Sequence, residues 1–191
     1  NDIKADLKLI KVESETIGEV HRGFKKEVDD LWPTLQPTIQ RYGAKRTYHV
    51  DIWFTGHSLG AAMATIIASR CYQDNDCPDP AELYTYGSPR VGDGDYVSCF
   101  NFPHHRYVNN NDIVTRVPMY IMGYRHHGTL HYFNCNGVEK KLTAWGKFKD
   151  RLVGLGRGII KLQMDSFSDR CGRMNQQPYA EFIQTLLDSF R

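Results

Sequence analysis

The pentapeptide Gly56-His-Ser-Leu-Gly60 constrains the fold of this chain more than any other stretch. A β-type run precedes it at residues 49–54 and a small-residue segment follows it at residues 61–70, so we expect a strand, a sharp turn and a helix. A serine on such a turn has a strained backbone, and we expect side chains at positions 56 and 60 to collide with neighbouring elements, which favours glycine at both.

This turn predicts a nucleophile. It exposes the hydroxyl of Ser58 at a helix N-terminus, where free N–H groups and the helix dipole favour negative charge. The backbone N–H of Leu59 is then predicted to donate to an oxyanion. The alternative is a plain strand-to-helix turn capped by serine, and the combination of strand, elbow and alanine-rich helix weighs against it.

Strand and helix patterns alternate along the rest of the chain. Strands are predicted at residues 7–12, 48–54, 82–86 and 106–108, and helices at residues 61–72, 93–101, 145–164 and 179–190. A further helix ends near Gly43, and Pro33 and Pro37 are expected to divide or kink it. The alternation predicts an α/β fold with a mostly parallel sheet flanked by helices, in one catalytic domain over residues 1–191.

Composition excludes several classes of protein. The 191 residues have a net charge of +2, which argues against a nucleic-acid partner. No apolar run approaches the roughly 20 residues of a transmembrane helix. No spacing of His, Cys, Asp or Glu is typical of a metal site, and no metal or other cofactor is predicted. Of the five cysteines, Cys71 and Cys77 flank a polar loop, and both a disulfide and free thiols are open.

A serine nucleophile needs a base, and the base needs an acid that orients it. In hydrolases with such an elbow the acid follows the serine in the chain and the histidine comes last. Asp112 follows the predicted strand at residues 106–108, at the sheet edge where catalytic groups of α/β folds gather. We therefore predict Asp112 as the acid, over a turn aspartate in an asparagine-rich loop.

Several segments together resemble the class 3 lipases, the fungal-type triacylglycerol lipase family of the α/β-hydrolase fold. In family order they are VHRGF at 20–24, TGHSLG at 55–60, YTYGSPRVG at 84–92, NNDIVTRVP at 110–118 and GYRH at 123–126. The resemblance implies an esterase or lipase with Ser58 as nucleophile, Asp112 as acid and no cofactor. Its substrate would be a lipid or another ester, met at a lipid–water interface.

The resemblance also implies residues before Asn1. Family members have an earlier strand ending in Arg-Gly-Thr or Arg-Gly-Ser, which gives the second oxyanion donor, and a lid follows it. Residues 1–7 resemble the end of that lid. We therefore expect the first strands, the second donor and most of the lid on a segment of this or another chain. Separately, a secreted location is slightly favoured.

The expected catalytic histidine is missing. The family has an Asp-His pair before its C-terminal helix, and the corresponding residues here are Asp169 and Arg170. An arginine stays protonated and cannot act as a base. Three interpretations are open: Arg170 disables the site, His126 or His127 replaces the base although structural roles are favoured for both, or the tail is aligned wrongly.

Two functions besides that of a triacylglycerol lipase follow from these observations. The polar stretch at residues 1–6 suits a soluble carboxylesterase, such as a feruloyl esterase. Arg170 suits a catalytically inactive hydrolase fold that binds lipid or a protein. Among the other histidines, His21 is expected to brace a loop near the active site, whereas His104 and His105 are expected in an exposed turn.

Overall fold

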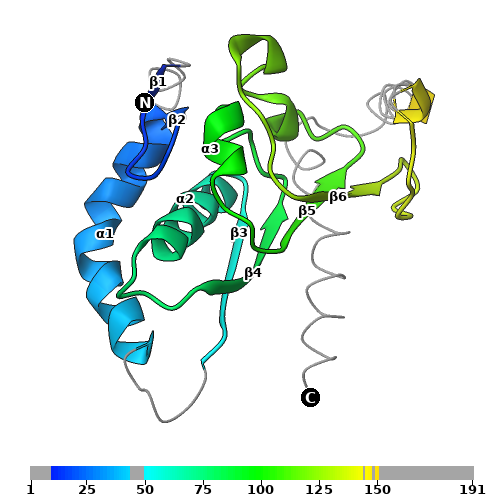
Figure 1. Ribbon diagram of the computed structural model, residues 1–191. Helices are drawn as coiled ribbons and strands as arrows, with labels where there is room; N and C mark the ends of the chain where they lie inside the picture. The colour runs from blue at the N-terminus through cyan, green and yellow to red at the C-terminus, as the bar shows by residue number, and fades with distance from the viewer. Residues whose placement is uncertain (1–9, 44–49, 144, 148, 151–191) are drawn as a thin grey trace, which may run out of the picture. The chain divides into compact units, whose positions relative to one another are not determined.

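The computed structural model describes residues 10–43, 50–143, 145–147 and 149–150 (Figure 1). The elements in chain order are β1 (Lys11–Glu13), β2 (Glu19–His21), α1 (Arg22–Gly43), β3 (Ile52–His57), α2 (Leu59–Gln73), β4 (Pro80–Tyr86), α3 (Gly94–Ser98), β5 (His104–Asn109), η1 (Val114–Arg116), η2 (Tyr120–Met122) and β6 (Thr129–Phe133). The chain divides into two compact units, residues 1–106 with 114–129 and residues 107–113 with 130–191. The single domain over residues 1–191 stays a prediction, and the lid remnant at 1–7 lies outside the described residues.

Two sheets are present among the described residues. Strands β3, β4, β5 and β6 form a parallel sheet in that order, and β1 pairs antiparallel with β2. In the register of β3 and β4, Trp53 is opposite Glu82 and His57 is opposite Tyr86. The parallel sheet with helices beside it confirms the predicted α/β class. The predicted edge strand at residues 7–12 begins later, at Lys11, and residues 7–9 lie outside the described residues.

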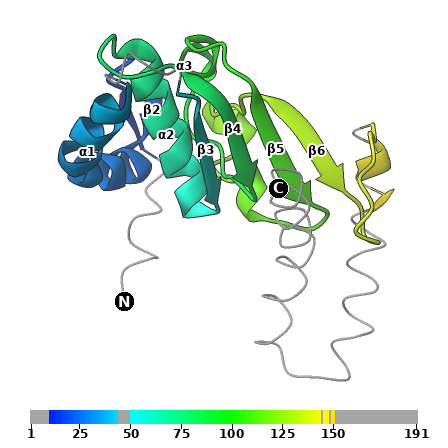
Figure 2. The ribbon, with the colours of Figure 1, turned by 90° about the horizontal axis from the view of Figure 1, so that it is seen from below.

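Helix α2 follows β3 directly and is almost wholly buried. Its alanines at 61, 62, 64 and 68 are at most 7% exposed. Small side chains let the helix approach the sheet closely, and a helix that is apolar on most sides is one enclosed by other elements. Figure 2 shows α1 beside α2, and α2 next to β3. The predicted helix after the elbow is thus confirmed.

Helix α1 corrects one prediction. It runs as one helix from Arg22 to Gly43, so the expected division at Pro33 and Pro37 is wrong, and the alternative of a kink stays a prediction. Each proline removes a backbone hydrogen bond and disfavours a helix interior. Val28 and Ile39 are buried in the same core cluster as residues of α2, and packing of this kind supplies most of the stability of helices in proteins. Tertiary contacts therefore outweigh the local cost of both prolines.

The prediction for His104 is also wrong. His104 begins strand β5 and is only 5% exposed, whereas the sequence suggested an exposed turn. Its imidazole is hydrogen-bonded to Thr85 of β4, so sheet pairing buries a residue whose immediate neighbours look turn-like. Near β6, Phe133 forms an antiparallel bridge with Glu139. Most of the predicted helices at 145–164 and 179–190 lies outside the described residues.

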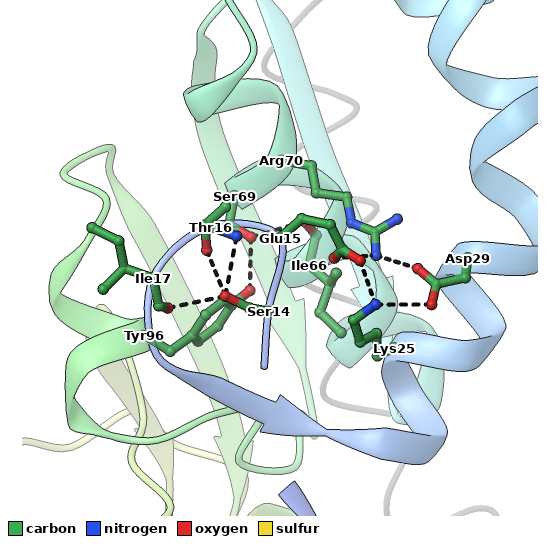
Figure 3. Close-up of polar contacts among 10 residues, drawn as sticks. All are labelled: Ser14, Glu15, Thr16, Ile17, Lys25, Asp29, Ile66, Ser69, Arg70 and Tyr96. Carbon is green, nitrogen blue, oxygen red and sulfur yellow. Dashed lines mark hydrogen bonds and ion pairs between the residues drawn. The ribbon is translucent and has the colours of Figure 1, made fainter. Parts of the chain in front are cut away.

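A cluster of four charged side chains ties the β1–β2 loop to helices α1 and α2 (Figure 3). Arg70 of α2 is 6% exposed and contacts Glu15 from the loop at 2.6 Å, and it also pairs with Asp29 of α1. Lys25 of α1 pairs with both carboxylates, at 3.1 Å from Asp29. Burial alone would raise the pKa of Asp29, but hydrogen bonds and charges from Arg70 and Lys25 hold that pKa below its usual value.

Replacing Arg70 with methionine should therefore destabilise the fold. The change leaves two carboxylates with Lys25 as their remaining cation in the cluster. Loss of one partner from a fully buried pair costs about 3–5 kcal/mol, and we expect about 2 kcal/mol because water screens Glu15 and Asp29. The measurement is the free energy of unfolding in urea at pH 7.

The matched control is Lys26→Met, which removes an exposed ion pair with Asp30 one turn along the same helix. Such a pair contributes only about 0.3–0.5 kcal/mol. Equal losses for the two variants would contradict a stabilising role for the cluster. Since the pKa of Asp29 is depressed, the stabilisation is present above its unfolded value of 3.8 and disappears as the pH falls through the lower folded value.

Candidate active site

The backbone of Ser58 has the strained conformation that the elbow requires. Its φ is 54° and its ψ is −123°, and among the described residues it is the one non-glycine with positive φ. Such a conformation costs of order 1–3 kcal/mol and persists where surrounding contacts enforce it. The Ser58 N–H donates to the carbonyl of Tyr86 at 3.0 Å, and the Ser58 carbonyl accepts from Ala61 at 3.0 Å. The predicted strand–turn–helix is confirmed.

The two elbow glycines differ. A Cβ added to Gly56 would lie 2.3 Å from the carbonyl oxygen of Gly60, so no side chain fits there without a backbone shift. A Cβ added to Gly60 would meet nothing within 4 Å. The expected collision is thus confirmed at Gly56 and wrong at Gly60. The crowding comes from the backbone of the first turn of α2, and only position 56 faces that turn.

The surface around the Ser58 hydroxyl is open and partly apolar. Ser58 is half-buried, His57 is exposed and Leu59 is 46% exposed. Leu59 is the first residue of α2, where backbone N–H groups lack partners within the helix. The site therefore presents an N-terminal helical turn beside the hydroxyl. Donation from Leu59 to an oxyanion stays a prediction.

Asp112 lies in the second compact unit, in the loop after β5. This position at the C-terminal end of the strand is the one predicted from the sequence. Asp112 is 3% exposed, and its N–H donates to the carbonyl of Asn109 at 3.0 Å. In the same unit the Tyr132 hydroxyl donates to Asn110 at 3.0 Å. A carboxylate this deeply buried is costly unless polar partners compensate it, which marks Asp112 as more than a surface turn residue.

Buried histidines form a network in the first unit that the sequence did not reveal. Thr85 Oγ1 lies 2.7 Å from His104 Nε2, and His104 Nδ1 lies 3.1 Å from His127 Nδ1. A bond between two Nδ1 atoms holds one proton, so one ring donates and the other accepts. A second proton between them would break the bond. Burial and the charges of His127 and Arg106 hold the pKa of His104 well below its usual value.

Both histidines considered as substitute bases have structural contacts here. His126 Nε2 lies 2.9 Å from the Thr115 carbonyl, to which it donates, and burial lowers its pKa to about 3. Arg106 Nε donates to the backbone carbonyl of His127 at 2.9 Å. Burial, followed by the Arg106 charge, lowers the pKa of His127 to about 4. These imidazoles stay neutral near pH 7, and one ring nitrogen of each is engaged with a neighbouring group.

His21 caps helix α1, and its expected bracing of a loop near the active site stays a prediction. Its Nδ1 accepts from the N–H of Gly23 at 3.1 Å and that of Phe24 at 3.4 Å, which caps the first turn of α1. Its ring also packs against that of Phe24, tilted by 33° with 4.2 Å between centroids. The sequence around a histidine does not show whether the folded chain buries it among other side chains. The structural roles of these histidines therefore became visible only in the tertiary structure.

The remaining predictions concern Arg170, the cysteines and metal binding. Arg170 and Cys171 lie outside the described residues. Cys71 and Cys77 are both buried and free, so the structure resolves the open alternative in favour of thiols, and burial raises the pKa of Cys71 to about 11. Within the described part of the chain, no group of three or more His, Cys, Asp or Glu side chains is arranged to hold a metal ion.

The family model for lipase (class 3) matches residues 1–122, which include the elbow and Asp112. The chain belongs to this family. A lipase of Rhizomucor miehei is 33% identical over 143 residues, which are 71% of this chain and 39% of the relative. A secreted mono- and diacylglycerol lipase 1 of Fusarium solani is 32% identical, over 65% of this chain and 37% of the relative. The chain thus spans less than two fifths of both relatives.

One solved structure bears directly on the site. It is a triacylglycerol lipase described as having a serine protease triad at its catalytic centre, with a TM-score of 0.56 and 28% identity. The comparison covers 71% of this chain and 53% of that one. The similarity extends the family assignment from sequence to the α/β-hydrolase fold.

The contrast between the two elbow glycines gives a prediction. Gly56→Ala forces the β3–α2 turn apart, so we expect a loss of stability of about 2 kcal/mol or more. Gly60→Ala meets open space within α2, where alanine is favoured over glycine by about 1 kcal/mol, so stability should be kept or raised. Urea unfolding of both variants measures the difference, and a destabilising Gly60→Ala would refute the one-sided crowding.

The buried histidines predict acid sensitivity. The pKa of His127 is lowered to about 4 from a model-compound value of 6.5, so the unfolded chain binds the proton first. Its contribution is fully present above pH 6.5 and is lost as the pH falls towards 4. We expect this loss to be on the order of 2 kcal/mol, and His127→Asn should flatten the profile. Unfolding free energies measured across this range test it; parallel profiles for the two proteins would exclude His127 as a source.

Proposed function

We propose that this chain is the nucleophile-bearing part of an ester hydrolase that acts on acylglycerols. The observation that supports the proposal most is the strained backbone of Ser58 at the start of α2, directly after β3. Proteins keep such strain where a function requires it. Membership of the class 3 lipases supports the role of Ser58 as a nucleophile, since the solved relative has a serine triad.

In the proposed reaction the Ser58 oxygen attacks the ester carbonyl and an imidazole base removes its proton. The Leu59 N–H, together with a donor expected on a segment before Asn1, stabilises the oxyanion. The base then protonates the leaving alcohol, and Asp112 orients the imidazole and stabilises its charged form. Water attacks the acyl-enzyme by the same steps in reverse, which releases the carboxylic acid and restores Ser58.

The source of the base is the open point, and we propose that residue 170 is its position. In family order the catalytic histidine follows Asp112 and precedes the C-terminal helix, where this sequence has Arg170. A guanidinium stays protonated and cannot accept the serine proton. The contacts of His126 and His127 support structural roles for both. The chain with Arg170 is therefore expected to be nearly inactive.

The proposed substrates are acylglycerols met at a lipid–water interface, because the relatives are called lipases and mono- and diacylglycerol lipases. A secreted location is proposed on the same ground, since that of Fusarium solani is called secreted. None of the helices in the described part of the chain has the length and apolar character that a membrane crossing requires. We propose that binding at the interface is peripheral.

The test is hydrolysis of a short-chain chromogenic ester by the full chain, compared with its Arg170→His variant. A triad lacking one member typically loses about 10⁴-fold or more in rate, so restoring the histidine should raise hydrolysis by at least about 10³-fold. Adding Ser58→Ala should abolish the gain. A short soluble ester isolates the chemistry from interfacial binding.

Two outcomes would overturn parts of this proposal. Full activity of the Arg170 form, dependent on Ser58, would place the base elsewhere and make His126 and His127 the next substitutions. Inactivity of both forms, with unfolding behaviour unchanged, would favour a catalytically inactive fold that binds lipid or protein. Preference for soluble feruloyl or acetyl esters over long-chain acylglycerols would make the protein a carboxylesterase.

A further inference from the structure

Three consecutive large apolar side chains are exposed at helix η2 and the residue before it. Met119 is 53% exposed, Tyr120 is 61% exposed and Ile121 is 87% exposed. We call these three residues the η2 tip. Single exposed apolar residues are ordinary on protein surfaces, but a run of three is unfavourable in water unless a function requires it.

The η2 tip stands on a fixed base. Pro118, which precedes it, is almost completely buried, and its carbonyl accepts a hydrogen bond of 2.8 Å from Arg90 Nη1. The helical turn is closed by Gly123, whose φ is 87° and whose N–H donates to the carbonyl of Tyr120 at 3.1 Å. On the far side, the N–H of Arg125 donates to the Gly92 carbonyl at 2.8 Å. The backbone on both sides of the tip is therefore held by hydrogen bonds.

Positive charge lies directly beside this apolar tip. The Arg125 guanidinium stacks on the Tyr120 ring, with Cζ 3.6 Å from the centroid, and donates to the carbonyls of Tyr120 and Tyr124 at 3.0 Å. Within the described residues, neither Arg125 nor Arg90 forms an ion pair with a carboxylate. Burial, followed by repulsion from Arg125, lowers the pKa of Arg90, consistent with two uncompensated cations.

A lysine near the tip is already paired with carboxylates. Lys11 lies 3.4 Å from the position of a Cβ on Gly123, and it pairs with Glu19 at 2.6 Å and lies 3.8 Å from Asp93. These three groups together carry one net negative charge, so the two arginines, Arg90 and Arg125, leave an excess of one positive charge near the tip. The excess charge comes from the arginines, one of which lies over the exposed tyrosine ring.

We propose that the η2 tip docks this protein onto a lipid surface that carries anionic head groups. Aliphatic side chains such as Ile121 enter the acyl boundary, tyrosine rings prefer the head-group level, and arginines contact phosphate or carboxylate groups. This order, from Ile121 through Tyr120 to Arg125, matches the layers of such a surface. The inference rests on the proposed action on lipid esters and names a contact with the interface that is separate from the catalytic elbow.

The test is sedimentation with vesicles of phosphatidylcholine, with and without phosphatidylglycerol, at low and high salt. The protein is the full chain with Ser58→Ala, so that no hydrolysis alters the lipid. Tyr120→Ser combined with Ile121→Ser should weaken binding to the anionic vesicles about tenfold or more, because it removes most of the inserted apolar surface. Binding of the unaltered tip should rise with phosphatidylglycerol and fall with salt.

Ile17→Ser is the matched control, since Ile17 is another isoleucine of the first unit and is 58% exposed. It should bind vesicles as well as the protein with the unaltered tip. Equal binding by the tip variant and this control would overturn the proposal. So would vesicle binding that does not depend on phosphatidylglycerol, or loss of a dimer in the tip variant during sedimentation without lipid.

The outcome is independent of the proposed chemistry. In the Arg170→His background with Ser58 intact, the tip substitutions should leave hydrolysis of a short soluble ester unchanged. Loss of vesicle binding in a chain that never hydrolyses esters would support docking and reject the enzyme function. Active ester hydrolysis, with no contribution of the η2 tip to vesicle binding, would support the enzyme function and reject docking by the tip.

Discussion

The rest of the structure depends on one close approach, that of Gly56 in β3 to the carbonyl of Gly60 in α2. A Cβ at position 56 would lie 2.3 Å from that oxygen. The strand and the helix can therefore meet in this way only if residue 56 is a glycine. The approach forces Ser58 into a positive φ and holds it at the start of α2. It also sets α2 on the sheet, where its alanines fill the core. Function and packing thus follow from the same turn.

Buried polar side chains form a hydrogen-bonded network inside the molecule. Thr85, His104 and His127 are linked across β4, β5 and the segment before β6, and Arg106 lies beside them. Buried polar side chains are tolerated because each is hydrogen-bonded, and their low pKa values are the consequence of that burial. Such a network gives the sheet a fixed arrangement near pH 7 and makes it sensitive to acid. The same burial sets these imidazoles apart from an exposed catalytic base.

The sequence predicted the strands β3, β4 and β5 and the helix after the elbow because hydrophobic periodicity is local. It failed where distant residues decide. Pro33 and Pro37 argue against a continuous helix, yet packing of Val28 and Ile39 keeps α1 whole. His104 sits among residues typical of a turn, yet pairing in the sheet buries it. The Arg70 cluster joins residues from three elements, which no spacing along the chain could reveal.

The sequence by itself determined the elbow, the identity of Ser58 as the candidate nucleophile, the place of Asp112 after a strand and the family. These features rest on short spacings, which local backbone geometry translates directly into structure. Only the tertiary structure decided that crowding affects Gly56 and spares Gly60, that Cys71 and Cys77 are free, and that the η2 tip is exposed. Burial, crowding and exposure depend on which surfaces meet, and the order of residues along the chain does not state that.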